Sequence, residues 1–158
     1  YAYPKVVQYV EATPYTTYTT IAASVGVGTI PIDNTIPQSG EGTEILTATI
    51  TPKHASNRLL ITCVIPVFAT SVAATVAASL LQDATANALA VSSLTTTNAA
   101  YHYGLILRHE MAAGTTSATT FKANIGVNSG NLYINGTSVS RMFGGIAAAR
   151  LTVEELGV

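Results

Sequence analysis

The chain has 158 residues, of which only 9% are charged, and its formal net charge is −1 at pH 7. This length fits one domain, so we expect a single domain over residues 1–158, with residues 1–8 as a candidate N-terminal connector. The near-neutral charge excludes the basic surface that nucleic-acid binding requires. A surface this poor in charge is either partly covered in an assembly or kept soluble by hydroxyls and amides.

The first third of the chain alternates between strand-like runs and a proline-containing crossover. Residues 5–12 and 14–24 are rich in β-branched and aromatic side chains, which favour strands. The stretch "TIPIDNTIPQSGEG" follows, and its two Thr-Ile-Pro units exclude both a helix and a central strand. Ile30, Ile32 and Ile36 share one parity, so an extended segment would turn all three toward the same surface. We therefore predict a stiff, extended crossover that grips a neighbouring surface.

The run "RLLITCVIPVF" is apolar on both faces of the predicted strand, whereas the preceding "ILTATIT" alternates apolar residues with threonine. One face of the run carries Leu59, Ile61, Cys63, Ile65 and Val67, and the other carries Leu60, Val64 and Phe68. A sandwich core needs only one of these faces, so another subunit is expected to cover the second one. Leu60 and Val64 are therefore candidate oligomer-interface residues.

Residues 59–82 contain no charge and are long enough to cross a bilayer. Their hydroxyls, alanines and Pro66 argue against a span, so we expect no membrane-spanning segment. Within this region, residues 71–89 fit either a helical stripe or strands. The surrounding β-pattern favours strands that end near Leu81, followed by a turn, and a helix stays as the alternative.

The C-terminal half continues the β-pattern. "YHYGLILRHEM" and "FKANIGV" alternate, "NSGN" and Asn135-Gly136 are typical of hairpin turns, and "ARLTVEEL" forms the last strand. Glu154 and Glu155 diverge on that strand and are expected at a solvated end. Eight or more short strands without βαβ alternation predict an all-β fold, an antiparallel β-sandwich of jelly-roll type. Its core is expected to contain Leu46, Ile50, Ile61, Leu107, Ile125 and Leu151.

No group of side chains in the sequence points to catalysis. His109 and Glu110 would face opposite sides of a strand, and no second histidine follows at the spacing of a zinc helix. Cys63 is the only cysteine, so no thiolate metal site or disulfide arises within one chain. We expect no enzyme activity, no catalytic residue, no metal and no cofactor. Tyrosines combine an apolar body with a polar tip, which makes Tyr101, His102 and Tyr133 the candidate ligand-binding residues.

The order of the motifs resembles that of the β-jelly-roll domains in tailed-bacteriophage virion surface proteins. "TTIPIDNTIPQSGEGTEILTATITPKHASNRLLI", "SLLQDATANAL", "AGTTSATTFKANIGVNSGNLYING" and the terminal "RLTVEE" carry this resemblance over roughly residues 9–156. It implies the C-terminal domain of a tail fibre, or a head fibre or capsid decoration protein. The repeated Thr-Ile-Pro segment would then be the covering strap of that family.

The resemblance also implies a function. It predicts a non-enzymatic structural or receptor-binding module, a homotrimer on the virion surface, with capsid or tail proteins and a host-surface glycan or protein as partners. Head and tail locations stay open. The alternative is a secreted carbohydrate-binding β-sandwich, against which the lack of tryptophan and of an acidic calcium cluster counts.

Overall fold

The computed structural model describes residues 4–24, 27–99 and 101–157, and these form ten strands and one short 3₁₀ turn. The elements are β1 (Lys5–Glu11), β2 (Thr19–Ala22), β3 (Thr43–Ile50), β4 (Arg58–Thr70), β5 (Thr75–Gln82), β6 (Ala90–Thr95), β7 (Tyr103–Ala112), β8 (Thr119–Val127), β9 (Asn131–Ile134), η1 (Phe143–Gly145) and β10 (Arg150–Gly157).

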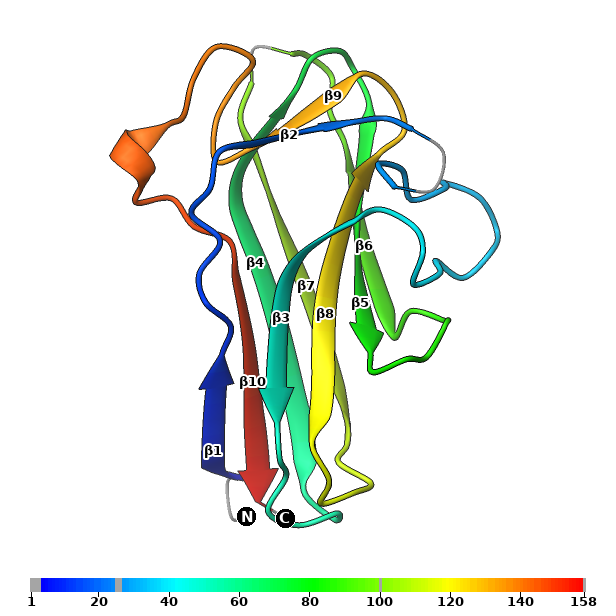
Figure 1. Ribbon diagram of the computed structural model, residues 1–158, viewed down its shortest axis with the longest axis vertical. Helices are drawn as coiled ribbons and strands as arrows, with labels where there is room; N and C mark the ends of the chain where they lie inside the picture. The colour runs from blue at the N-terminus through cyan, green and yellow to red at the C-terminus, as the bar shows by residue number, and fades with distance from the viewer. Residues whose placement is uncertain (1–3, 25–26, 100, 158) are drawn as a thin grey trace.

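The strands form two antiparallel sheets that pack face to face (Figure 1). The six-stranded sheet has the order β1-β10-β4-β9-β2, with β7 paired to the other edge of β4. The four-stranded sheet has the order β3-β8-β5-β6. The predicted jelly-roll β-sandwich is confirmed. Of the segment that we expected as a connector, residues 5–8 lie in β1, where Lys5, Val6 and Gln8 pair with β10. Residues 1–3 lie outside the described part of the chain.

The core lies between the two sheets and is built from every second residue of each central strand, the residues whose side chains point inward. The threonines of "ILTATIT" turn outward, and the aliphatic residues between them turn inward, as period-two alternation requires. All six residues predicted for the core are at most 3% exposed: Leu46, Ile50, Ile61, Leu107, Ile125 and Leu151.

The prediction for Phe68 is wrong. Simple parity placed it outward with Leu60 and Val64, but its side chain is fully buried. The pairing of β4 with β7 shifts register between Ile65 and Phe68, where Pro66 cannot donate a ladder hydrogen bond. The extra residue turns Phe68 into the core, where its ring stacks on Tyr103 at a centroid distance of 5.9 Å.

The strand interpretation of residues 71–89 is confirmed, and the helical alternative is wrong. Thr75–Gln82 form β5, which is hydrogen-bonded to β6 on one side and to β8 on the other. Residues 59–82 thus fold into β4 and β5 rather than a helix. Among the described residues, no helix has the length and apolar character needed to cross a membrane.

Both predicted hairpin turns are wrong. The "NSGN" segment connects β8 in one sheet to β9 in the other, so it joins the layers and closes no hairpin. Asn135 is buried with φ +59°, and its Nδ2 donates to the carbonyls of Tyr15 and Thr17 at 2.8 and 3.1 Å. The chain turns later, where the Thr137 amide donates to the Ser140 carbonyl at 2.9 Å.

Cys63 lies in the core, as expected, with 1% of its surface exposed. Burial raises the pKa of its thiol to about 12, because the thiolate would lose its hydration. The thiolate is the nucleophile, so the folded protein should react with 5,5′-dithiobis(2-nitrobenzoic acid) at least about a hundredfold more slowly than the protein unfolded in guanidinium. Equal rates in the two states would show that this position opens readily to solvent.

Candidate functional site: an assembly face and a strap cleft

The outer surface of the six-stranded sheet presents an apolar centre. We call this surface the assembly face. Val64 of β4 lies between Arg150 of β10 and Ile106 of β7, and Ile106 is 64% exposed. Leu60 lies four residues, or two pleat repeats, from Val64 on the same face of β4 and is half-buried. The outward apolar and hydroxyl residues of the face are Val6, Tyr9, Leu60, Thr62, Val64, Ile106, Thr152 and Leu156.

The charges on the assembly face are largely matched in pairs. Arg58 pairs with Glu110, and Arg150 pairs with Glu11. The hydrogen bond from Arg150 holds the pKa of Glu11 below its ordinary value. Matched charges leave no strong single-sign field that would repel an identical subunit. The face therefore combines two properties of an interface, a low net charge and an exposed apolar centre.

The end of β10 is fixed by a buried carboxylate, so the expectation that Glu155 is solvated is wrong. Its side chain is fully buried and accepts hydrogen bonds from the Lys53 amide at 2.8 Å, the His54 amide at 3.2 Å and Asn57 Nδ2 at 2.6 Å. Burial alone would raise the pKa of Glu155, but the donors of Lys53, Asn57 and His54 outweigh it and lower the pKa. These contacts lock the 52–57 turn to the last strand. Glu154 points outward to the assembly face.

The three candidate ligand-binding residues do not form a common site. Tyr101 and His102 lie in the exposed segment that precedes β7, with Tyr101 58% exposed. Tyr133 lies in β9 and is only 8% exposed, because both faces of this short strand are covered. Its ring is therefore not available as a platform for a ligand.

Residues 29–42, the predicted strap, lie on the outer face of the four-stranded sheet. The Val127 amide donates to the Gly28 carbonyl at 2.9 Å, and the Ala88 amide donates to the Pro37 carbonyl at 2.9 Å. Asn124 Nδ2 donates to the Glu41 carbonyl at 2.9 Å. A Cβ at Gly126 would lie 2.6 Å from the Ile30 nitrogen, so only glycine permits this close approach.

Of the three isoleucines in the strap, one is buried and two are exposed, so the prediction that all three pack on the neighbouring surface is wrong. Ile30 is 1% exposed, whereas Ile32 and Ile36 are 53% and 54% exposed. Asp33 Oδ1 accepts hydrogen bonds from the Thr35 amide at 2.8 Å and the Thr35 hydroxyl at 2.6 Å. These bonds lower the pKa of Asp33 and close a tight turn. The turn breaks the extended conformation, so the parity that linked the three isoleucines no longer holds.

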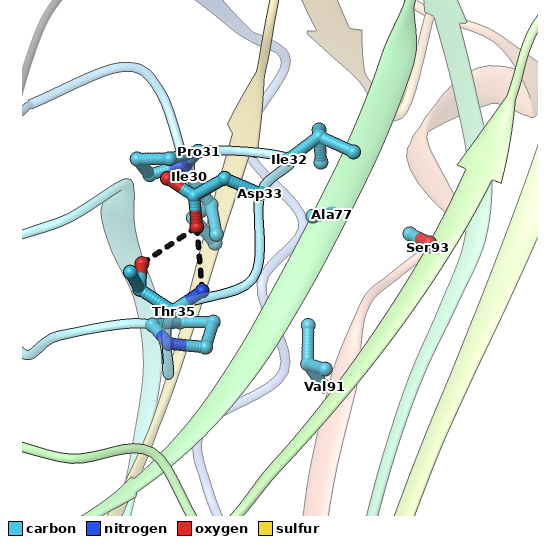
Figure 2. Close-up of a pocket in the computed structure, with 9 residues that line it drawn as sticks. Ile30, Pro31, Ile32, Asp33, Thr35, Ala77, Val91 and Ser93 are labelled. Carbon is cyan, nitrogen blue, oxygen red and sulfur yellow. Dashed lines mark hydrogen bonds between the residues drawn. The ribbon is translucent and has the colours of Figure 1, made fainter.

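A cleft of about 140 Å³ lies between the strap and strands β5 and β6. Figure 2 shows Ile32 extending from the strap over β5, with Val91 and Ser93 projecting from β6. The small side chain of Ala77 leaves the floor hollow.

A second hollow along Ile36, Pro37 and 88–91 shares Val91 with the first. The sequence pointed to the strap through its repeated Thr-Ile-Pro, but Val91 and Ile106 were missed although each alternates with inward-facing residues.

A family comparison identifies the chain. The model of the Pgp3 C-terminal domain matches residues 18–156, which is most of the protein. The chain belongs to the Pgp3 C-terminal domain family. Pgp3 is a Chlamydia protein and not a phage component, so the bacteriophage tail-fibre and capsid-decoration assignment and the virion-surface location are wrong. The expected capsid and tail partners have no support. The motifs behind that assignment recur in sandwiches with different roles.

Structure comparison supports the fold independently of sequence. Eiger TNF from S. frugiperda superposes with a TM-score of 0.52 at 7% identity, covering 97% of this chain and 94% of that one. At this identity the likeness concerns the fold alone. No curated protein sequence matches this Pgp3-family chain.

Proposed function

We propose that this Pgp3-family domain is a non-enzymatic binding domain that acts as a homotrimer. The observation that carries the proposal is the assembly face, on which Leu60, Val64 and Ile106 form an apolar centre among paired charges. Burying such a centre is favourable by roughly 25 cal/mol of free energy per Å² of apolar surface, because that surface is removed from water. The number three rests on the TNF-like fold, which suits a trimer.

A three-fold ring needs two complementary patches on every subunit, because its contacts are head-to-tail. The apolar centre of the assembly face is one of them. The margin of this face on the border strand β1 is the other, since Val6 and Tyr9 are 46% and 52% exposed there and the neighbouring Val7 is 42% exposed. Each subunit should bury on the order of 800 Å² against a neighbour, as stable interfaces of standard size do.

The absence of enzyme activity is part of the proposal, and the distribution of reactive groups supports it. In residues 4–24, 27–99 and 101–157, no three His, Cys, Asp or Glu side chains gather in a way that could hold a metal ion. Cys63 is buried, and Glu155 is engaged with three donors. The proposal therefore assigns the function to surfaces rather than to a reactive centre.

A charge placed in the apolar centre should break the assembly. Val64→Lys is expected to shift the protein from trimer to monomer at micromolar concentration, because an unpaired ammonium would be buried at the interface. Sedimentation velocity measures the change, and the matched control is Val139→Lys, at a position that is 87% exposed in the segment before β10. A trimer that withstands Val64→Lys would rule out this face.

A further inference from the structure

The only asparagine that precedes a glycine in the sequence, Asn135, is buried together with Gly136. The pair directly follows β9, which lies beside β2 at the end of the sandwich away from β1 (Figure 1). An asparagine loses its side-chain amide most readily before glycine, because glycine has no Cβ to hinder attack by its own backbone nitrogen. The fold therefore encloses the dipeptide of this chain that is most prone to deamidation.

The packing requires both residues of the pair. Asn135 has φ +59°, a left-handed conformation that asparagine tolerates better than most residues. Its Nδ2 donates to two backbone carbonyls, those of Tyr15 and Thr17. A Cβ at Gly136 would lie 2.6 Å from the ring of Tyr18, so a larger residue does not fit there. The close packing thus excludes a less reactive dipeptide with a bulkier second residue.

The same contacts shield the pair from reaction. The Gly136 nitrogen can bond to Asn135 Cγ only after the side chain has left the two carbonyls that it binds. The backbone is held as well, since the Asn135 amide donates to the Val67 carbonyl at 2.9 Å and its carbonyl accepts from the Met142 amide at 3.0 Å. Ring closure needs rotation of both the side chain and the backbone. The reaction therefore requires a local opening of this segment.

We propose that Asn135-Gly136 is a deamidation site that the native fold shields, and that its modification in an opened chain prevents the return to the native fold. The Gly136 nitrogen forms a bond to Asn135 Cγ and gives up its proton, and the Cγ–Nδ2 bond breaks with release of ammonia. Water then hydrolyses the cyclic imide at either carbonyl, which leaves aspartate or isoaspartate at position 135. Water is the only co-reactant of the sequence.

Neither product fits the place of Asn135. An aspartate would turn a carboxylate oxygen, instead of an N–H, toward the carbonyl oxygens of Tyr15 and Thr17. Asn135 Oδ1 has no hydrogen-bond partner among the described residues, so no donor would compensate the buried charge. Isoaspartate would add a carbon to the backbone between the hydrogen bonds to Val67 and Met142. Either product would detach residues 15–17 from the end of β9.

Peptide mass spectrometry tests the shielding. The full chain is incubated at mildly alkaline pH with a reductant, once in native buffer and once in guanidinium, and the conversion of Asn135 is followed with time. We expect the reaction in native buffer to be at least about tenfold slower than in guanidinium, because it requires local opening. A smaller difference between the two rates would contradict the shielding.

Tyr18→Phe is the variant that should weaken the shield. It removes the hydrogen bond from the Tyr18 hydroxyl to the Thr137 carbonyl at 2.6 Å, so the reaction in native buffer should be about fivefold faster. Tyr101→Phe is the matched control, since the Tyr101 side chain is 58% exposed, and it should react as the wild type does. In guanidinium all three chains should react at the same rate. No acceleration in Tyr18→Phe, or the same acceleration in the control, would contradict the local opening.

Refolding tests the consequence of the modification. Chains partly modified in guanidinium are returned to native buffer, and the compact fraction is isolated by size-exclusion chromatography. Chains modified at position 135 should be at least about fivefold rarer in this fraction than in the starting mixture, because they bury an uncompensated charge or a lengthened backbone. A smaller depletion would overturn the proposal. The inference does not rest on the trimer, because Asn135 is buried and is not part of the assembly face.

Discussion

Phe68→Ala is expected to lower the free energy of unfolding by about 3–5 kcal/mol, the range for truncating a buried phenylalanine. The loss has two sources, the apolar surface withdrawn from the core and the contact with the Tyr103 ring. The register shift at Pro66 puts the ring there, so the experiment tests the irregularity of β4 directly. Guanidinium unfolding at one fixed protein concentration measures the change, because assembly adds to apparent stability.

The control for this truncation is Val139→Ala, at a position that is 87% exposed. It should change the free energy of unfolding by less than about 0.5 kcal/mol, as surface substitutions do. A loss of that small size at Phe68 would instead place the ring on the surface, where simple alternation put it.

Glu155→Ala is expected to cost about 3 kcal/mol at pH 7, since it leaves buried donors of Lys53, His54 and Asn57 without an acceptor. The wild type should also lose stability in acid. The folded-state pKa of Glu155 lies below its ordinary value of 4.5, so its contribution is present above about pH 4.5. It disappears as the pH falls through the folded-state pKa, because protonation removes the charge that the donors stabilise.

The pH dependence separates this mechanism from a general packing defect. The stability difference between wild type and Glu155→Gln should shrink below about pH 4.5, where the wild-type carboxylate becomes protonated. Lys53 and His54 also face this site, and other groups of the protein contribute to the pH dependence of its stability. The same series of unfolding measurements against pH is therefore made on Glu44→Gln as a control. Glu44 forms an exposed ion pair with Lys122 at 3.2 Å, and its loss should cost no more than about 1 kcal/mol. A difference for Glu155→Gln that is constant from neutral to acid pH would contradict the mechanism.

The sandwich could be predicted from the sequence because its central strands alternate regularly. Leu46, Ile50 and Ile125 lie where period two places them. Alternation fails where the backbone is irregular. The register shift before Phe68 and the turn between Asp33 and Thr35 both reverse which side chains face inward, and neither is visible in the spacing of apolar residues.

The surfaces were only partly predictable. The two apolar parities of β4 led to Leu60 and Val64, which the fold places beside Ile106 on one face. Glu155 was missed because its partners come from a turn about a hundred residues away, and local pattern carries no such information. The Thr-Ile-Pro repeat indicated a strap, but a structural motif does not specify a family, and the phage assignment failed for that reason.

Multi-angle light scattering on the unmodified chain at micromolar concentration distinguishes the proposed homotrimer from a monomer or a dimer. A homotrimer should give a single species of three times the 16.3 kDa chain mass. A stable monomer of 16.3 kDa would contradict the assembly, and a dimer would contradict its three-fold symmetry.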